Sequence, residues 1–120
     1  GLVGLSRGDR KIPKLRMGAL HVQGRLPPEV IQRIVRQNFG RYRLCYENAL
    51  RSRPDVAGRV AVKLVIDRTG AVESAVDHGS DMPDKDMIQC VVRGFANLSF
   101  PEPEGGNVTV VFPITFEPGQ

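Results

Sequence analysis

Residues 58–76 read GRVAVKLVIDRTGAVESAV, and this stretch decides the fold. Apolar side chains alternate along residues 60–66, which is the two-residue period of a strand with one buried face. Asp67-Arg68-Thr69-Gly70 follows, and its glycine can take the left-handed conformation that ends a type I turn with a G1 bulge. The alternation resumes at Val72, so the sequence predicts a β-hairpin.

Helical patterns flank this hairpin on both sides. Before it, apolar positions recur at three- and four-residue spacing from about Glu29 to Leu50, and prolines precede and follow this run. Gly40 lies inside the run and predicts a local bend or a close packing contact. After the hairpin, a second helix is predicted from a buried stripe that includes Ile88 and Phe95.

A weak strand signal at residues 19–24 and a long alternating strand at residues 108–116 complete the pattern. The order strand, helix, strand, strand, helix, strand predicts one α+β domain. We expect an antiparallel sheet of three to four strands with two helices packed on one face.

Pro113 lies inside the last strand. Because proline cannot donate a ladder hydrogen bond, we expect this strand at an edge of the sheet or at a bulge. An open edge can recruit an extended peptide or a second copy of the chain. Pro113 can equally serve to prevent such pairing, and both interpretations remain open.

The net charge of +4 is located entirely in residues 1–16, where five basic side chains face one acidic one. We expect residues 1–16 to be a flexible basic linker and residues 17–120 to be the folded domain. An arm that binds phosphate or a membrane surface is the alternative. No apolar run is long enough for a membrane span, so any anchor is expected in a part of the protein outside this sequence.

Arginines crowd the outer side of the first predicted helix. They could form a solvated surface with helix-stabilising partners at Glu29 and Glu47, or a docking face for an acidic protein, the anionic envelope or nucleic acid. Interleaved aromatic side chains are missing from that side, so we do not expect nucleic acid. The candidate docking residues are Arg33, Arg36, Arg43 and Arg51.

The sequence contains no convincing catalytic or metal site. His78, Ser80 and Asp81 are neighbours along a strand and turn, and such neighbours rarely converge as a catalytic triad. The few cysteines and histidines lack the paired spacing of a zinc site. Asp81, Asp84 and Asp86 lack the glycine and terminal glutamate of a calcium loop and are better explained as helix-capping acids. We therefore expect a protein that is not an enzyme and needs no cofactor.

The chain has two cysteines, Cys45 in the first predicted helix and Cys90 in the second. If both helices cover the same face of the sheet, the sulfur atoms can meet as a disulfide, which would indicate an oxidising compartment. Each cysteine also borders an apolar stripe, so two free buried cysteines are the alternative.

Several short motifs occur along the chain in an order and spacing that resemble those of a known family. They are Cys45-Tyr46-Glu47, Gly58-Arg59-Val60, Gly70-Ala71-Val72, Cys90-Val91, Phe100-Pro101 and Gly105-Gly106. Over about residues 18–118 the chain resembles the C-terminal domain of TonB-type energy-coupling proteins. Within that group it resembles the AgmX/PglI C-terminal family of myxobacteria and related deltaproteobacteria.

The resemblance implies a periplasmic domain of an inner-membrane-anchored protein, which binds envelope partners and transmits force from a proton-driven motor in energy transduction or gliding motility. It favours the disulfide over free cysteines. In TonB itself the last strand pairs with a partner peptide, a role that passes here to Val108, Val110, Val111, Phe112 and Ile114.

The implied partners are an envelope protein or peptide, bound by strand addition, and the rest of the protein's own membrane-anchored chain. A homodimer stays open. The alternative function is a cytoplasmic module that binds nucleic acid or an acidic protein through the arginine-rich first helix.

Overall fold

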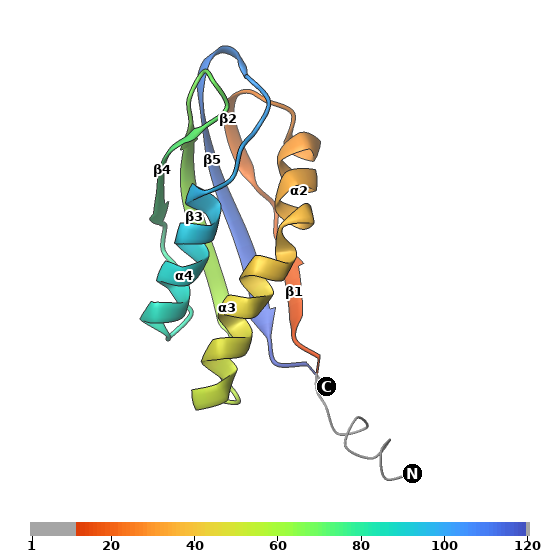
Figure 1. Ribbon diagram of the computed structural model, residues 1–120, viewed down its shortest axis with the longest axis vertical. Coiled ribbons are helices and arrows are strands. Elements are labelled where there is room, and N and C mark those ends of the chain that lie inside the picture. The colour runs from red at the N-terminus through yellow and green to blue at the C-terminus, as the bar shows by residue number, and fades with distance from the viewer. Residues whose placement is uncertain (1–11, 120) are drawn as a thin grey trace.

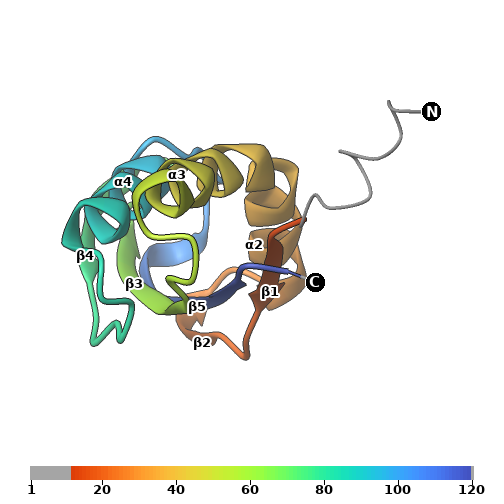
Figure 2. The same cartoon turned by 90° about the horizontal axis from the view of Figure 1, so that it is seen from below.

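The computed structural model describes residues 12–119, which form an α+β domain (Figure 1). Within this range a five-stranded antiparallel sheet carries three helices, all on one of its faces, as the end-on view in Figure 2 shows. In chain order the elements are β1 (Lys14–Met17), β2 (His21–Arg25), α2 (Pro28–Gln37), α3 (Phe39–Ser52), β3 (Gly58–Ile66), β4 (Val72–Asp77), α4 (Lys85–Ala96) and β5 (Glu104–Glu117).

The strand order is β1-β5-β3-β4, and β2 also pairs with β5. β1 and β2 lie one after the other along the same side of β5, while β3 pairs with its other side. Within residues 12–119, β4 pairs with β3 alone and forms the opposite edge of the sheet (Figure 1). The predicted fold class is therefore confirmed.

The sheet has more strands than predicted because a segment expected in the linker is a strand. Lys14–Met17 pairs with Ile114–Glu117 at the far end of the chain, and Arg16 forms an ion pair with Glu117 at 2.8 Å. The predicted linker boundary at residue 16 thus falls inside β1. Residues 1–11 of the predicted linker lie outside the described residues.

The core lies between the sheet and the helices. The alternation in β3 is confirmed, because Val60, Val62, Leu64 and Ile66 are fully buried while Arg59 and Lys63 are exposed. Ala61 is the exception, since it is fully buried on the other face, opposite Pro113. Five alternate residues of β5 are also fully buried: Val108, Val110, Phe112, Ile114 and Phe116. Each alternating strand therefore supplies one apolar layer beneath the helices.

The turn between β3 and β4 confirms the predicted role of its glycine. Gly70 has a φ of +91°, and its N–H donates to the Asp67 carbonyl at 2.9 Å. A Cβ at Gly70 would lie 1.9 Å from the Phe100 carbonyl oxygen, so only glycine fits here. The Asp67 carboxylate accepts hydrogen bonds from the Thr69 hydroxyl at 2.6 Å and from backbone N–H groups, and these bonds hold the pKa of Asp67 below its usual range.

The prediction of one continuous first helix is wrong. The helix ends at Gln37, and a new one begins at Phe39 after Asn38, which has a φ of −108° and a ψ of 12°. The Asn38 side chain donates to the Ile34 carbonyl at 2.8 Å, so it satisfies a backbone group that the ending helix leaves free. The chain thus breaks two residues before Gly40, and an added Cβ at Gly40 would meet no atom within 4 Å.

The prediction that the last strand lies at an edge is also wrong. β5 has β3 on one side and β1 with β2 on the other. The Pro113 carbonyl accepts from the Gly18 N–H at 2.9 Å, so the backbone of Pro113 points toward the connection between β1 and β2 and away from β3. The missing N–H of Pro113 therefore costs nothing in the β3–β5 ladder.

Candidate functional site

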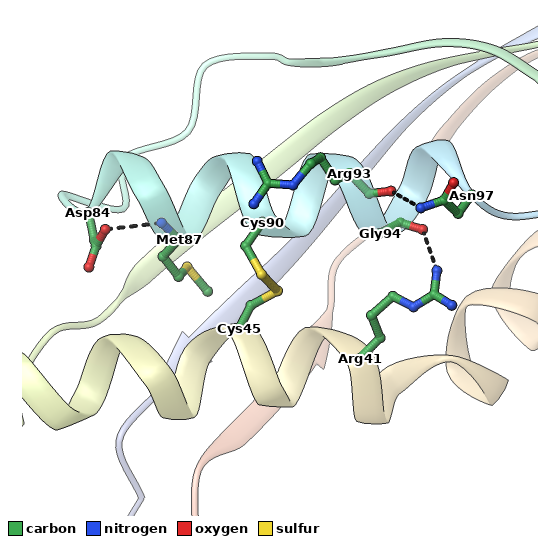
Figure 3. The surroundings of a disulfide bond; sticks show 8 residues. All are labelled: Arg41, Cys45, Asp84, Met87, Cys90, Arg93, Gly94 and Asn97. Atoms are coloured by element: carbon green, nitrogen blue, oxygen red, sulfur yellow. Dashed lines mark hydrogen bonds between the residues drawn. A yellow bond between two sulfur atoms is a disulfide. The ribbon is translucent and has the colours of Figure 1, made fainter.

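A disulfide joins α3 to α4. The Cys45 and Cys90 sulfur atoms are bonded, and the two Cα atoms lie 5.8 Å apart across the facing helices (Figure 3). Cys45 is buried and Cys90 is half-buried. The predicted disulfide is confirmed, and such a bond is compatible with an oxidising, extracytoplasmic location.

Two further contacts hold the same pair of helices together. A Cβ added at Gly94 in α4 would lie 2.8 Å from the Tyr42 ring, so the glycine lets α3 approach closely. Arg41 in α3 donates to the Gly94 carbonyl at 3.3 Å, as Figure 3 shows. At the start of α4, Asp84 accepts from the Met87 N–H at 3.0 Å, which confirms the capping role predicted for that acid. The helix pair is thus fixed covalently and by packing.

The two tyrosines of α3 differ in their polar contacts, although both side chains are fully buried. The Tyr46 hydroxyl donates to the Val56 carbonyl at 2.6 Å, whereas the Tyr42 hydroxyl has no partner within the described chain. Burial raises the pKa of both, for Tyr46 to about 12. Both tyrosines are therefore neutral parts of the core.

The residues predicted to pair with a partner peptide have no open edge in this fold. Val108, Val110, Val111, Phe112 and Ile114 all belong to β5, whose two sides are occupied by strands of the same chain. A peptide could pair there only if β1 or β2 left the sheet. The strand order therefore corrects the prediction that a peptide adds as a strand at these positions. The residue pattern of β5 alone does not reveal that order.

The predicted arginine docking residues do not lie on one continuous helix. Arg33 and Arg36 belong to α2, whereas Arg43 and Arg51 belong to α3 beyond the break at Asn38. Arg43 donates to the Pro13 carbonyl at 3.4 Å, and the other three are exposed. Among residues 12–119 the one ion pair is that of β1 with β5, so the expected pairing with Glu29 and Glu47 is not formed.

The polar residues after β4 are tied to the backbone and not to one another as a triad. The Ser80 hydroxyl donates to Asp77 and accepts from the Ala61 N–H, while Asp81 accepts from the Arg59 N–H at 2.6 Å. His78 is exposed. Within the described part of the chain no three His, Cys, Asp or Glu side chains lie close enough to hold a metal ion. No helix in the same range has the length and apolar character needed to cross a bilayer.

The open edge of β4 is the feature that sequence reasoning missed. The His78 N–H donates to the Ala61 carbonyl at 2.8 Å, which makes Val62 and Asp77 a pair without mutual hydrogen bonds. By alternation, the backbone groups of Val76 point toward β3, whereas those of Ala75 and Asp77 point away from it. Val76 itself is an exposed apolar side chain at 51% accessibility.

A groove runs beside this edge, between the end of β4 and the first turns of α4. Its volume is about 420 Å³. Its lining combines apolar and polar side chains: Met82, Pro83 and Ile88 are apolar, and Asp77, Ser80, Lys85 and Gln89 are polar. The sequence signal that could have indicated it is the run from Glu73 to Asp86, which holds five carboxylates and one lysine in a chain of net positive charge.

Comparisons of the chain with protein-family models, with curated proteins and with solved structures found no match.

Proposed function

We propose that this chain is a non-enzymatic, periplasmic protein-binding and force-coupling domain of TonB type. In this proposal it belongs to an inner-membrane-anchored protein and links a proton-driven motor to envelope partners, in transport or in gliding motility. The observation that carries the proposal is the Cys45–Cys90 bond between α3 and α4. Structural disulfides persist in oxidising compartments such as the periplasm and are rare in the cytosol.

The sheet supports a mechanical role. β1 lies at one edge and β4 at the other, with β5 and β3 between them. A load that enters at β1 and leaves at β4 crosses three antiparallel ladders, and hydrogen bonds perpendicular to the strands share a load along the strand direction. The disulfide fastens α3 to α4, so these two of the three helices cannot separate from each other while the sheet is under load.

Crosslinking in intact cells tests the proposal on the natural full-length protein. Cells are treated with formaldehyde, fractionated, and the crosslinked partners are identified with and without a protonophore that dissipates the proton gradient. We expect the protein in the envelope fraction, crosslinked to envelope proteins, with a pattern that changes when the gradient is lost. Recovery in the cytosol with nucleic acid or soluble acidic proteins would contradict the proposal and favour the alternative use of the arginine-rich helices.

A further inference from the structure

We propose that the groove between β4 and α4 binds an extended, cationic peptide segment of a partner protein, which adds as a strand to the open edge of β4. This inference rests on the proposed protein-binding function and names its site and the chemistry of its partner. It places the site on the edge opposite to β1 and β2, where no strand formed by residues 12–119 is in the way.

The first step is the supply of backbone hydrogen bonds. Ala75 and Asp77 each present an N–H and a carbonyl away from β3, so they offer up to four bonds to an added antiparallel strand. The other edge is less suitable. β1 and β2 have only four and five residues, and the pairing of β2 is interrupted between Gln23 and Arg25. The pairing of β4 shifts only at its start, between Val72 and Ser74, and is regular at Ala75 and Asp77. Short strands and bulges are features that discourage pairing at an edge.

The second step is side-chain selection. Residues of a peptide that pair with Ala75 and Asp77 share their face of the sheet, which is the face that α4 covers. These side chains would enter the groove beside Ile88 and Met82, so an apolar side chain is favoured there. An added strand beside a helix, with pockets for alternate side chains, is a general mode of peptide recognition.

The third step is charge. The segment from Glu73 to Asp86, which forms the edge and most of the groove, has a formal charge of −4, whereas the whole chain has +4. A negative surface beside the groove attracts a cationic segment and repels an anionic one. The same charge disfavours a second copy, because antiparallel pairing of two β4 strands about Ala75 would set Glu73 opposite Asp77.

A larger hollow at the start of α2 is the main rival. It has a volume of about 580 Å³ and lies between the end of β2 and the connection from α4 to β5. Its charges are mixed, with Arg25 against Glu102 and Glu104. It also adjoins the irregular part of β2, so it lacks the continuous edge that strand addition needs.

Peptide titration followed by backbone amide NMR on the ¹⁵N-labelled 120-residue chain tests the proposal. The probe is the acetylated, amidated peptide Lys-Arg-Val-Thr-Leu-Thr-Arg-Lys. One control peptide replaces every basic residue by glutamate. A second keeps the charge and the side chains but carries backbone N-methyl groups on the valine and the leucine, whose N–H groups would otherwise bond to Ala75 and Asp77. We expect shift changes confined to β4, residues 78–83 and the first turns of α4. Each control peptide should bind about tenfold or more weakly, because it loses charge attraction or ladder bonds.

A pair of proline substitutions sharpens the test. Ala75→Pro removes an N–H that points outward and no ladder bond to β3, so the fold is expected to persist while affinity for the probe falls about tenfold. Val22→Pro is the matched control in β2. Its partner Val110 directs its backbone at β3, so Val22 also faces outward, and this change should leave affinity unaltered. The peptide comparisons need no variant and remain decisive if Ala75→Pro fails to fold.

Three results would overturn the inference. They are shift changes centred on β1, β2 or the arginines of α2 and α3, equal binding of the N-methylated peptide, and no change at the groove up to millimolar peptide. Each leaves the proposed function standing if envelope partners still crosslink in cells. Cytosolic recovery in the crosslinking experiment would remove the proposed function without altering the peptide result.

Discussion

Reduction of the disulfide should strongly lower the stability of the domain. The Cys45–Cys90 bond closes a loop between residues 45 positions apart. In the chain-entropy treatment a loop of this length restricts the unfolded chain enough to contribute about 4 kcal/mol at 25 °C. This value equals about a thousandfold change in the unfolding equilibrium, and for a domain of this size about 15 °C in melting temperature.

The comparison is best made on one polypeptide. Urea unfolding of the chain, followed by far-UV circular dichroism, is measured with and without a phosphine reductant. Both forms then contain the same side chains, so the difference in the free energy of unfolding isolates the crosslink. The slope with urea should also rise on reduction, because an uncrosslinked unfolded chain exposes more surface.

The variant with both cysteines replaced by alanine is the control, since the reductant should leave its unfolding curve unchanged. A difference of less than about 1 kcal/mol between the oxidised and reduced chains would refute the reasoning, because it lies far below the entropy of closing such a loop. The close contacts at Gly94 would then suffice to hold the helices, and the disulfide would have no mechanical part.

Four other predictions concern single residues. Tyr46→Phe should lower the free energy of unfolding by about 1–2 kcal/mol, because the carbonyl that accepts its hydroxyl is left unpaired. Tyr42→Phe should raise it by about 1 kcal/mol, because it removes a buried hydroxyl without a partner, and equal losses in urea unfolding for both variants would contradict this. Gly70→Ala should lower the free energy of unfolding by about 2–4 kcal/mol, because the new Cβ adds backbone strain and collides with Phe100. Gly79→Ala is the control, since Gly79 also has a positive φ but lies in open space, and it should lower the same free energy by about 1–2 kcal/mol. Similar melting temperatures for the two variants would refute the role of the close contact at Gly70. The pKa of Asp67 should lie below its usual range in an NMR titration, so its stabilising effect is present at neutral pH and lost as the pH falls through that pKa; an ordinary value would show that its hydrogen bonds do not persist in solution.

The parts of the fold that follow from local pattern were predictable from the sequence. The β3–β4 hairpin depends on the alternation from Val60 to Ile66 and on one glycine with positive φ. Both features can be recognised from residues that are neighbours in the sequence. The two cysteines could be placed on facing helices for the same reason. Only the resemblance favoured their pairing over two free thiols.

The strand order could not be read from local pattern, because it depends on residues far apart in the chain. β1 has four residues and pairs with a segment about a hundred positions away, so nothing in its own sequence distinguishes it from a linker. Together with β2, β1 occupies the side of β5 that the sequence predicted to be open, so Pro113 does not mark an edge strand. The open edge that remains for pairing is that of β4. The break at Asn38 was missed because the apolar spacing continues across it, although Gly40 indicated a bend nearby.

The oxidation state of the two cysteines in living cells tests the central claim most directly. Cells that make the natural full-length protein are quenched in acid, and free thiols are alkylated with a maleimide large enough to shift the protein on a gel. We predict no shift at Cys45 or Cys90 unless a reductant is added before alkylation. Two alkylated thiols in the unreduced sample would show that the bond is not formed in the cell, and the assignment to an extracytoplasmic coupling domain would be wrong.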